Sequence, residues 1–368
     1  MRIAYVSLHW PRTNSESVGR KIFEQLHIWQ SAGHATKLFM HTSIYEPRSN
    51  LIPGNYYFYR LYNSPFGMIQ TEIDRSRAVT QLIEAIRQYQ PNLIYLRYGI
   101  YVYPVHRITN LAPTIEEINT NDVTQHKDLG MIYDVYNRTT RGILLRRVSG
   151  LACVSHELAQ AKEFRKYDRS TVVIANGIDL SSIPTIPAPM NKIPKLVFIA
   201  TPGYSWHGVD KIVRLAKRFS DLQIIIIGYD ESALNSKKSD NLSCLGYLEP
   251  PDYKKILEGA DLGLGTLALH RKSMNEASPL KTRECLAYGL PMVLPYKDTD
   301  LDDLECDFLL KIPNREDNID THGEAIHEFA YKMCGKRADR SVLLPRIDLM
   351  DKETTRLEFF HQIASSQP

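Results

Sequence analysis

The segment from residue 275 to 291 has the residue types and spacing best suited to chemistry in this sequence. Ser278 is a favoured helix N-cap, and Pro279 suits the first helical position, where no N–H group is needed. Gly289 fits the position after the helix, and Pro291 prevents the helix from continuing. The pattern predicts a short helix with defined ends. Its first turn would offer backbone N–H groups to an anion at the positive end of the helix dipole.

Three charged side chains accompany this predicted helix start. Lys281 lies in the first turn, Glu276 stands just before the helix, and Glu284 lies inside it. A diphosphate would take the helix terminus and the lysine, while hydroxyl-rich sugars on either side would take the carboxylates as hydrogen-bond acceptors. The alternative is a capped helix whose Glu and Lys side chains only face water.

The two glutamates are separated by seven residues, and the segment resembles the E-x7-E signature of the family-four retaining glycosyltransferases of the GT-B fold. Other stretches resemble the same family, in order and at fitting spacing. Asn-Gly-Ile-Asp at 176–179 is similar to a strand end between the family's two domains, and 227–230 and 245–248 stand where its nucleotide-lining loops fall. The resemblance extends along most of the chain.

The resemblance implies a role for each residue of the signature. Glu284 would bind the ribose hydroxyls of a nucleoside diphosphate sugar, and Glu276 would contact the transferred sugar. Gly228 and Leu248 would line the nucleotide. The diphosphate would be held by the Lys281 ammonium and by the backbone of Ser278, Pro279, Leu280 and Lys281. Catalysis would then be electrostatic, without a metal ion, and the anomeric configuration would be retained through attack on the same face.

The first strand–helix junction of the second half departs from the family, which usually carries an Arg and a Lys-Gly that reach the diphosphate. The junction here reads Thr-Pro-Gly-Tyr-Ser-Trp-His-Gly from residue 201, with Gly203 as its loop glycine. His207 is the candidate for the place of the lysine, and Arg271 or Lys272 for the missing charge. The alternative for His207 is a structural corner with the adjacent tryptophan.

The first half departs from the family as well. The family usually has two consecutive glycines at its first loop, whereas only Gly19 stands here, beside Arg20. We expect Gly19 to lie on the donor side. The histidine that many relatives place after a strand of this domain is absent, and Glu117 and Asn119 occupy that region. Either of these two side chains would orient the acceptor.

The elements that must position these residues follow from hydrophobic periodicity. Strands are expected at 3–8, 36–40, 93–96, 114–118, 150–154, 196–200, 223–227, 261–267 and 292–294. Helices are expected at 73–90, 131–147, 209–219, 252–259 and 279–288. Strands that alternate with helices form a parallel sheet with helices on both faces. We predict an α/β chain of GT-B-like class, with two Rossmann-like doubly wound domains facing across a cleft.

A proline-rich stretch marks the expected boundary between these domains. Pro184, Pro187, Pro189 and Pro194 resist both helix and central strand, which places a linker at 181–195. Residues 1–180 would bind the acceptor and 196–345 the nucleotide sugar. The helical pattern within 346–368 predicts a C-terminal helix. Packing back on the first domain is one option for it, but the sequence does not say which domain it joins.

Composition bounds the class of protein. A length of 368 residues suits two domains, and the net charge of +3 excludes a polybasic nucleic-acid binder. Residues 1–190 carry 21 basic and 15 acidic side chains, so the first half could face an acidic partner or a membrane surface. The alternative is chance scatter of charge over solvated faces. Five cysteines without a paired spacing and the lack of a signal peptide or membrane span favour the cytoplasm, with peripheral membrane contact as a further option.

Two other patterns do not indicate a metal or dinucleotide site. Asp298 and Asp300 form a D-x-D pair of the type that holds a metal-bound nucleotide, but they lie in an acidic stretch that predicts a solvated loop. Gly263 and Gly265 lack the third glycine of a dinucleotide fingerprint. The family resemblance implies that neither a cofactor nor a metal ion is needed, with the nucleoside diphosphate sugar as co-substrate.

The sequence thus predicts a retaining hexosyltransferase of polysaccharide biosynthesis, acting on a glycan or lipid-linked acceptor. One alternative is a catalytically silent nucleotide- or sugar-binding protein of the same fold, which the altered junction at 201–208 keeps open. A nicotinamide-dependent oxidoreductase is disfavoured because no G-x-G-x-x-G follows the first strand.

Overall fold

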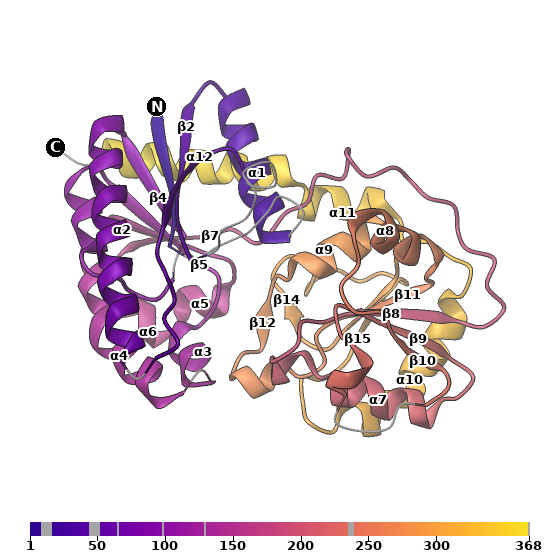
Figure 1. Cartoon of the computed structure of the whole chain (residues 1–368). Coiled ribbons are helices and arrows are strands. Elements are labelled where there is room, and N and C mark those ends of the chain that lie inside the picture. The colour runs from indigo at the N-terminus through magenta and orange to yellow at the C-terminus, as the bar shows by residue number, and fades with distance from the viewer. Residues whose placement is uncertain are drawn as a thin grey trace. The chain divides into compact units, whose positions relative to one another are not determined.

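The expected alternation of strands and helices builds two large parallel sheets in the computed structural model of the chain (Figure 1). The structure describes residues 1–8, 17–43, 52–64, 66–97, 99–128, 130–234 and 239–366. Unit 1 comprises Met1–Ile174 and Lys352–Pro368, and unit 2 comprises Ala175–Asp351. Each unit has its own sheet and its own core.

The sheet of unit 1 has seven strands, all parallel. In chain order they are β1 (Arg2–Ser7), β2 (Ala35–Thr42), β3 (Asn55–Phe58), β4 (Leu93–Arg97), β5 (Thr114–Ile118), β6 (Gly150–Cys153) and β7 (Ser170–Val173). Their order in space is β3-β2-β1-β4-β5-β6-β7, so the direction in which strands are added reverses between β1 and β4. In doubly wound sheets, ligands bind at the carboxyl ends of the strands at such a reversal.

Helices cover both faces of this sheet, because side chains of successive strand residues point to opposite faces. Tyr5 of β1 and Tyr95 of β4 share a core with the apolar side of one helix pair, α1 and α12, while α2 contacts β2 and β3. The helices of the unit are α1 (Ser17–Ser31), α2 (Gly67–Tyr89), α3 (Asp122–Asp128), α4 (Met131–Leu145), α5 (His156–Gln160), α6 (Lys162–Arg165) and α12 (Leu349–Ser365), with a 3-10 turn η2 (Val105–Asn110).

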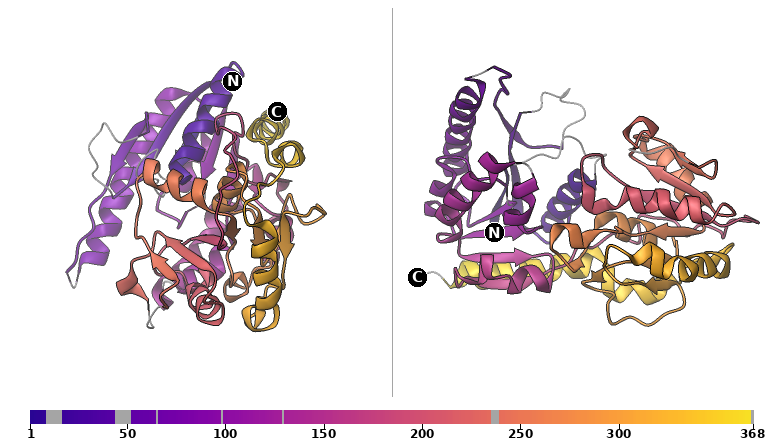
Figure 2. Two further views of the ribbon diagram at one scale, coloured as in Figure 1. Left: turned by 90° about the vertical axis from the view of Figure 1, so that its right-hand side faces the viewer. Right: turned by 90° about the horizontal axis from the view of Figure 1, so that it is seen from below.

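The C-terminal helix α12 is part of the core of unit 1 (Figure 2). Trp29 of α1 stacks on Tyr5 with ring centroids 5.7 Å apart and meets Phe360 of α12 edge-on at 5.1 Å. The carboxylate of Glu353 accepts hydrogen bonds from Trp29 Nε1 at 2.8 Å and from Gln25 Nε2 at 3.0 Å. Residues far apart in the chain therefore build one hydrophobic cluster with a satisfied polar centre.

The main sheet of unit 2 has six parallel strands in the spatial order β10-β9-β8-β11-β13-β15. They are β8 (Lys195–Ile199), β9 (Gln223–Ile227), β10 (Leu242–Cys244), β11 (Leu262–Leu264), β13 (Met292–Leu294) and β15 (Leu309–Lys311). A second, two-stranded sheet joins β12 (Glu276–Ala277) to β14 (Lys297–Asp298). The helices are α7 (Val209–Arg218), α8 (Pro250–Gly259), α9 (Leu280–Ala287), α10 (Asn318–Met333) and α11 (Arg340–Ile347), with 3-10 turns η3 (Ser205–His207), η4 (Glu231–Ala233) and η5 (Leu269–Lys272).

The proline-rich segment ahead of β8 packs against unit 2. Asn191 Nδ2 donates to the Asp261 carboxylate at 2.8 Å, and the Arg340 guanidinium donates to the carbonyl oxygen of Ile183 at 2.8 Å. The division between the two units falls at Ile174 and Ala175, before the prolines. Prolines exclude regular structure from this segment without preventing it from lying on the surface of the unit.

The predicted α/β class with two doubly wound parallel sheets is confirmed. The short strands β3, β7, β10 and β15 were not predicted. No helix in the described part of the chain is long and apolar enough to cross a membrane.

Candidate functional site

The candidate site of unit 2 lies where its strand order reverses, between β8 and β11. After β8 the chain adds β9 and β10 on one side, and after β11 it adds β13 and β15 on the other. The segments that follow β8 and β11 therefore diverge at the carboxyl edge of the sheet and leave room for a ligand. The predicted residues His207, Lys272 and Lys281 all come from segments at this edge.

Helix α9 begins one residue later than the sequence predicts. Pro279, with φ −73° and ψ 134°, takes the N-cap position instead of Ser278. The Ser278 hydroxyl oxygen accepts hydrogen bonds from the Asn176 N–H and from a guanidinium N–H of Arg283, both at 2.9 Å. Ser278 therefore ties the Asn-Gly-Ile-Asp segment to the helix rather than capping it. The cap prediction was wrong because Asn176, 102 residues away in sequence, and Arg283, in the helix itself, engage the Ser278 hydroxyl.

The two ends of α9 otherwise match the prediction. The Thr282 N–H donates to the Pro279 carbonyl at 3.1 Å, so the N–H groups of Leu280 and Lys281 precede the first intrahelical bond. Helix geometry leaves these two groups for an external acceptor such as a phosphate. At the other end, Gly289 adopts φ +71° directly after the C-cap residue Tyr288.

Lys281 extends from the first turn of α9 to the end of β8. Its ammonium donates to the carbonyl oxygen of Ile199 at 2.9 Å and lies 5.2 Å from the ring centroid of Phe198. Burial lowers the pKa of Lys281 to about 7. A half-buried ammonium whose hydrogen bond within the described part of the chain goes to one carbonyl is only partly compensated for the loss of water, and an anionic ligand would restore the compensation.

His207 lies beside this lysine as a neutral imidazole. Its Nδ1 accepts the Thr201 N–H at 3.0 Å, so Nε2 carries the ring proton and remains a donor. Burial lowers its pKa to about 2, and the charges of Lys281 and Lys272 add to the effect. Trp206 meets the imidazole edge-on at 4.2 Å and carries the Lys272 ammonium 4.8 Å from its ring centroid. The structure thus combines the Trp–His corner with a cluster of His207, Lys281 and Lys272.

Arg271 is engaged elsewhere. Its guanidinium makes two 2.8 Å contacts with the Asp210 carboxylate and bonds Glu316 and the Ser205 carbonyl with its remaining donors. It would have to exchange these partners to reach a diphosphate. Among the candidates for the missing charge, only Lys272 acts electrostatically on His207.

Glu284 is almost fully buried in the second turn of α9. Its carboxylate accepts the hydroxyl of Tyr253, from α8, at 2.8 Å. Leu248 is partly buried and lies two residues before α8, the helix that carries Tyr253. Tyr253 was not predicted, because its contact with Glu284 joins two helices that are far apart in the sequence.

The second signature glutamate lies on the small sheet. Glu276 of β12 stands opposite Lys297 of β14 and is partly exposed, directly before the turn into α9. The neighbouring D-x-D pair is not the solvated loop that was predicted. Asp298 is 1% exposed, and both of its oxygens, together with one of Asp300, bond the buried Arg283 at 2.8–2.9 Å. Arg283 therefore neutralises these carboxylates.

The predicted glycines belong to the loops of this edge. Gly228 ends β9 at φ +81°, and a Cβ there would lie 2.3 Å from the Ala200 carbonyl oxygen. Its N–H donates to the Gly246 carbonyl at 2.6 Å, which joins the loops after β8, β9 and β10. Gly203 adopts φ +87° in the exposed loop after β8.

The remaining predicted residues lie in unit 1. Gly19 is buried in the first turn of α1. Glu117, at the carboxyl end of β5, is fully buried between Lys21 Nζ at 2.6 Å and Arg97 Nη1 at 2.8 Å. Burial opposes ionisation of Glu117, but Lys21, Arg97 and Arg356 together hold its pKa well below the usual range. Asn119 accepts from Lys21 at 3.5 Å. Glu117 would therefore influence an acceptor indirectly, by holding the side chains of Lys21 and Arg97 in place.

Comparison with solved structures identifies the architecture. The sucrose-phosphate synthase from Thermosynechococcus elongatus is 12% identical, with each chain covered completely and a TM-score of 0.68. The lipopolysaccharide outer core galactosyltransferase WaaB is 11% identical, with 98% of this chain and 100% of that chain covered and a TM-score of 0.66. The chain has a GT-B-like fold. An alpha-glucosyltransferase in complex with UDP and DNA shares this fold at 10% identity and a TM-score of 0.62, with 97% of this chain and 99% of that chain covered.

The sequence itself matches no known family. No family model matches the chain, and no curated protein matches it. Within the residues that the structure describes, no three His, Cys, Asp or Glu side chains are grouped so that they could hold a metal ion. The GT-B-like fold is therefore assigned from the structure, and the roles of individual residues stay predictions.

Proposed function

We propose that the chain is a glycosyltransferase that takes a sugar from a nucleoside diphosphate sugar. The observation that carries the proposal is the convergence of Lys281, the Nε2–H of His207 and the N-terminus of α9 at the switch point of unit 2. Donors of this kind suit a group that gains negative charge during the reaction. A departing nucleoside diphosphate is such a group.

Different residues of the site would bind different parts of the donor. Glu284, oriented by Tyr253, would accept hydrogen bonds from the ribose hydroxyls, and Glu276 would contact the transferred sugar. Lys281 and the first N–H groups of α9 would hold the diphosphate, with Lys272 adding positive charge. His207 would donate one hydrogen bond and exchange no proton, because burial keeps it neutral throughout the physiological range.

Cleavage of the anomeric C–O bond would leave the electron pair on the diphosphate oxygen, where these donors stabilise it. We propose retention of the anomeric configuration and no requirement for a metal ion, in line with the E-x7-E resemblance. The acceptor would be a glycan or a lipid-linked sugar of polysaccharide biosynthesis. It would bind at the carboxyl edge of unit 1, where Arg97 and Lys21 flank Glu117.

The test is incubation of the protein with a panel of nucleotide sugars and candidate acceptors, with nucleoside diphosphate release as the readout. NMR of the product then gives its anomeric configuration. Glu284→Ala should weaken donor binding about tenfold or more, because it removes a charged acceptor of hydrogen bonds. Glu328→Ala, an exposed glutamate on α10, is the matched control.

Unchanged donor affinity in Glu284→Ala would contradict the assigned pose. Thermal stabilisation by a nucleotide sugar without diphosphate release, with every acceptor tried, would favour the silent binding protein instead.

A further inference from the structure

Large apolar side chains are exposed at the starts of two helices of unit 1. Phe66 is 79% exposed at the entry to α2, and Met131 is 80% exposed at the first residue of α4. Neighbouring exposed apolar residues are Met68, Ile69, Ile132 and Val135. We call these six side chains the apolar tip. Side chains of this type are normally buried, and a cluster of them on a surface marks a contact site.

The two helix starts lie close to each other. The charges of Glu72 and Arg75, from α2, act on the pKa of Tyr136 from α4. Both helices also contact η2. Since α2 follows β3, and α4 follows β5 after the short helix α3, both start on the side of the carboxyl edge of the parallel sheet, at the lower left of Figure 1. The apolar tip is therefore a single surface, on the edge where doubly wound sheets take their ligands.

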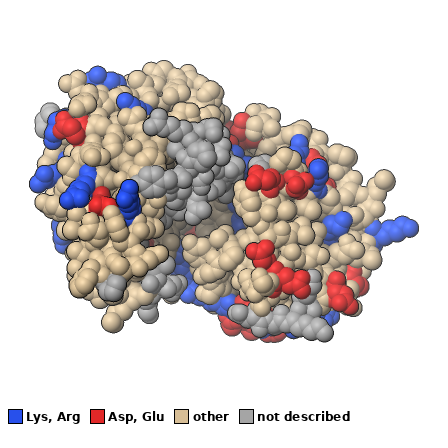
Figure 3. All heavy atoms as spheres, viewed as in Figure 1, with Lys and Arg blue, Asp and Glu red and all other residues tan. Residues whose placement is uncertain are grey.

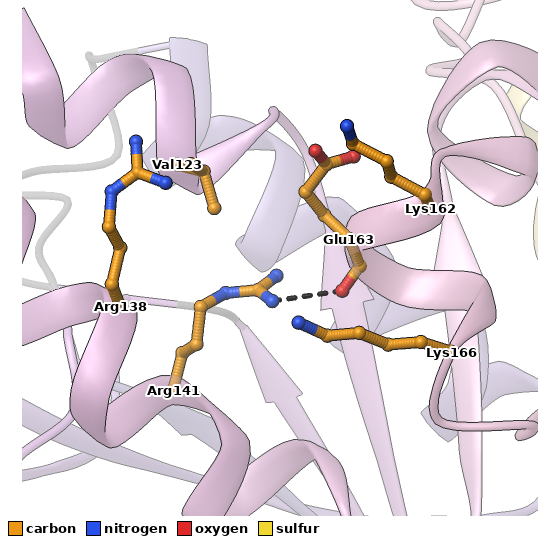
Figure 4. A pocket seen from close by; sticks show the side chains of 6 residues that line it. All are labelled: Val123, Arg138, Arg141, Lys162, Glu163 and Lys166. Carbon is orange, nitrogen blue, oxygen red and sulfur yellow. Dashed lines mark hydrogen bonds between the residues drawn. The ribbon is translucent and has the colours of Figure 1, made fainter.

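Basic side chains border the apolar tip. Arg138 follows Val135 on the same exposed side of α4, and it lines a pocket of about 410 Å³ between α3, α4 and the α6 segment. Figure 4 shows Arg138 and Arg141 on one side of this pocket and Lys162 and Lys166 on the other. We call these four residues the basic pocket.

Acidic groups balance only part of the charge of the basic pocket. Arg141 is held by Asp122 at 2.6 Å, and Arg138 pairs with Asp134 at 2.7 Å. Lys162 and Lys166 are exposed, and Glu163 is the one acidic residue among those that line the pocket. On the face drawn in Figure 3, blue Lys and Arg side chains are scattered over unit 1 with little red of Asp and Glu among them. The pocket is thus suited to a phosphate group.

We propose that the apolar tip and the basic pocket together form a docking surface for a bilayer that contains anionic phospholipids. The apolar side chains enter the headgroup region, and the cations take lipid phosphates beside them. The inference rests on the proposed function for one point only, the delivery of a lipid-linked acceptor to the carboxyl edge of unit 1.

A second copy of this chain is the competing occupant. A two-fold contact would place each apolar tip against another and would bring the two basic pockets toward each other. Like charges at such short range oppose association, whereas an anionic membrane complements both halves of the surface. The charge therefore favours the bilayer.

The experiment is co-sedimentation of the full chain with vesicles of phosphatidylcholine, with or without phosphatidylglycerol. We expect binding to the anionic vesicles at low salt, little binding to neutral ones, and weaker binding in roughly 1 M salt, where the Debye length is about 3 Å. The apolar variant is I69S/M131S and the charge variant is K162E/K166E. K162E/K166E should weaken vesicle binding at least tenfold, since one lysine near an anionic surface contributes about fivefold. I69S/M131S should also weaken it at least tenfold, because it removes two apolar side chains from the headgroup region.

Matched controls come from unit 2. Met190→Ser changes an apolar side chain that is 98% exposed, and K217E/K255E changes two exposed lysines. Both controls should bind vesicles as the wild type does. All altered side chains are exposed, and circular dichroism confirms that each variant is folded.

Three results would overturn the inference: no binding of the wild type to anionic vesicles at low salt, wild-type binding by folded I69S/M131S, or a wild-type dimer in light scattering that this variant abolishes. Vesicle binding requires no nucleotide sugar. A failed transferase assay with intact vesicle binding would therefore contradict only the proposed function, and the reverse result only the docking surface.

Discussion

The proposed function predicts that Lys281 makes the binding of a nucleoside diphosphate depend on pH in a defined direction. Burial lowers its pKa to about 7 in the free protein, so the side chain is half neutral at that pH. A bound diphosphate favours the ammonium and should return the pKa toward its usual value of about 10.4. Under the proposed function, the protein should take up a proton when it binds a nucleoside diphosphate such as UDP above pH 7, and binding should weaken as the pH rises.

The size of the effect follows from the lowered pKa. Between pH 7 and pH 9 the protonated fraction of Lys281 in the free protein falls about 50-fold, and the dissociation constant for UDP should rise by the same factor, about 2 kcal/mol. At pH 8 binding should take up about 0.9 proton per UDP. Below pH 6 the lysine is charged in both states and contributes no dependence.

Isothermal titration calorimetry measures both quantities. The dissociation constant is followed from pH 6 to 9, and proton uptake is obtained in two buffers that differ in ionisation enthalpy. Lys281→Met keeps the length of the side chain but cannot bind a proton, so its curve reports the titration of UDP itself. Lys217→Met, on the last turn of α7, is the matched control and should behave as the wild type.

A wild-type dissociation constant that stays flat from pH 7 to 9 would refute the reasoning. So would wild-type affinity of Lys281→Met at pH 7, because the ammonium would then make no contact with the diphosphate.

Two further predictions concern buried charge in unit 1. Glu116 is fully buried, neither carboxylate oxygen has a hydrogen-bond partner among the described residues, and burial raises its pKa from 4.5 to about 8. As the pH rises, the unfolded chain thus loses this proton before the folded chain does, and the free energy of unfolding should fall from about pH 4.5 to 8. In urea unfolding, the wild type should lose about 3 kcal/mol between pH 4.5 and 7, and Glu116→Gln should lack this loss. An equal loss in the variant would contradict the prediction. Arg356 bonds Glu353 at 2.9 Å and lies 4.0 Å from Glu117, all of them buried. Arg356→Met should lower the free energy of unfolding by about 3–5 kcal/mol, and a loss below about 1 kcal/mol would show that the pair is not held as described.

Features that depend on neighbouring residues could be predicted from the sequence. The end of α9 follows from Gly289 alone, because only a residue that tolerates positive φ fits there. The alternating apolar runs likewise predicted two parallel sheets, since burial on both faces leaves a continuous run.

Features that depend on distant residues could not be predicted. Ser278 is a good N-cap by type, yet its hydroxyl accepts the N–H of Asn176, 102 residues away. Arg271 is a suitable phosphate ligand by type, yet its guanidinium donates to both carboxylate oxygens of Asp210, 61 residues away. Contacts of this kind exist only after the sheet has assembled, and a single sequence does not record which partner is reached.

Helix α12 determines the order in which the chain folds during synthesis. It covers Trp29 and supplies Glu353 and Arg356 to the interior of unit 1, yet its residues leave the ribosome after all of unit 2. At a synthesis rate of about 5–20 residues per second, the first sheet waits roughly 10–35 s with its aromatic cluster uncovered. Unit 2 can complete its fold first although it comes second in the sequence, and a nascent chain that stalls before α12 exposes a surface for chaperones to bind.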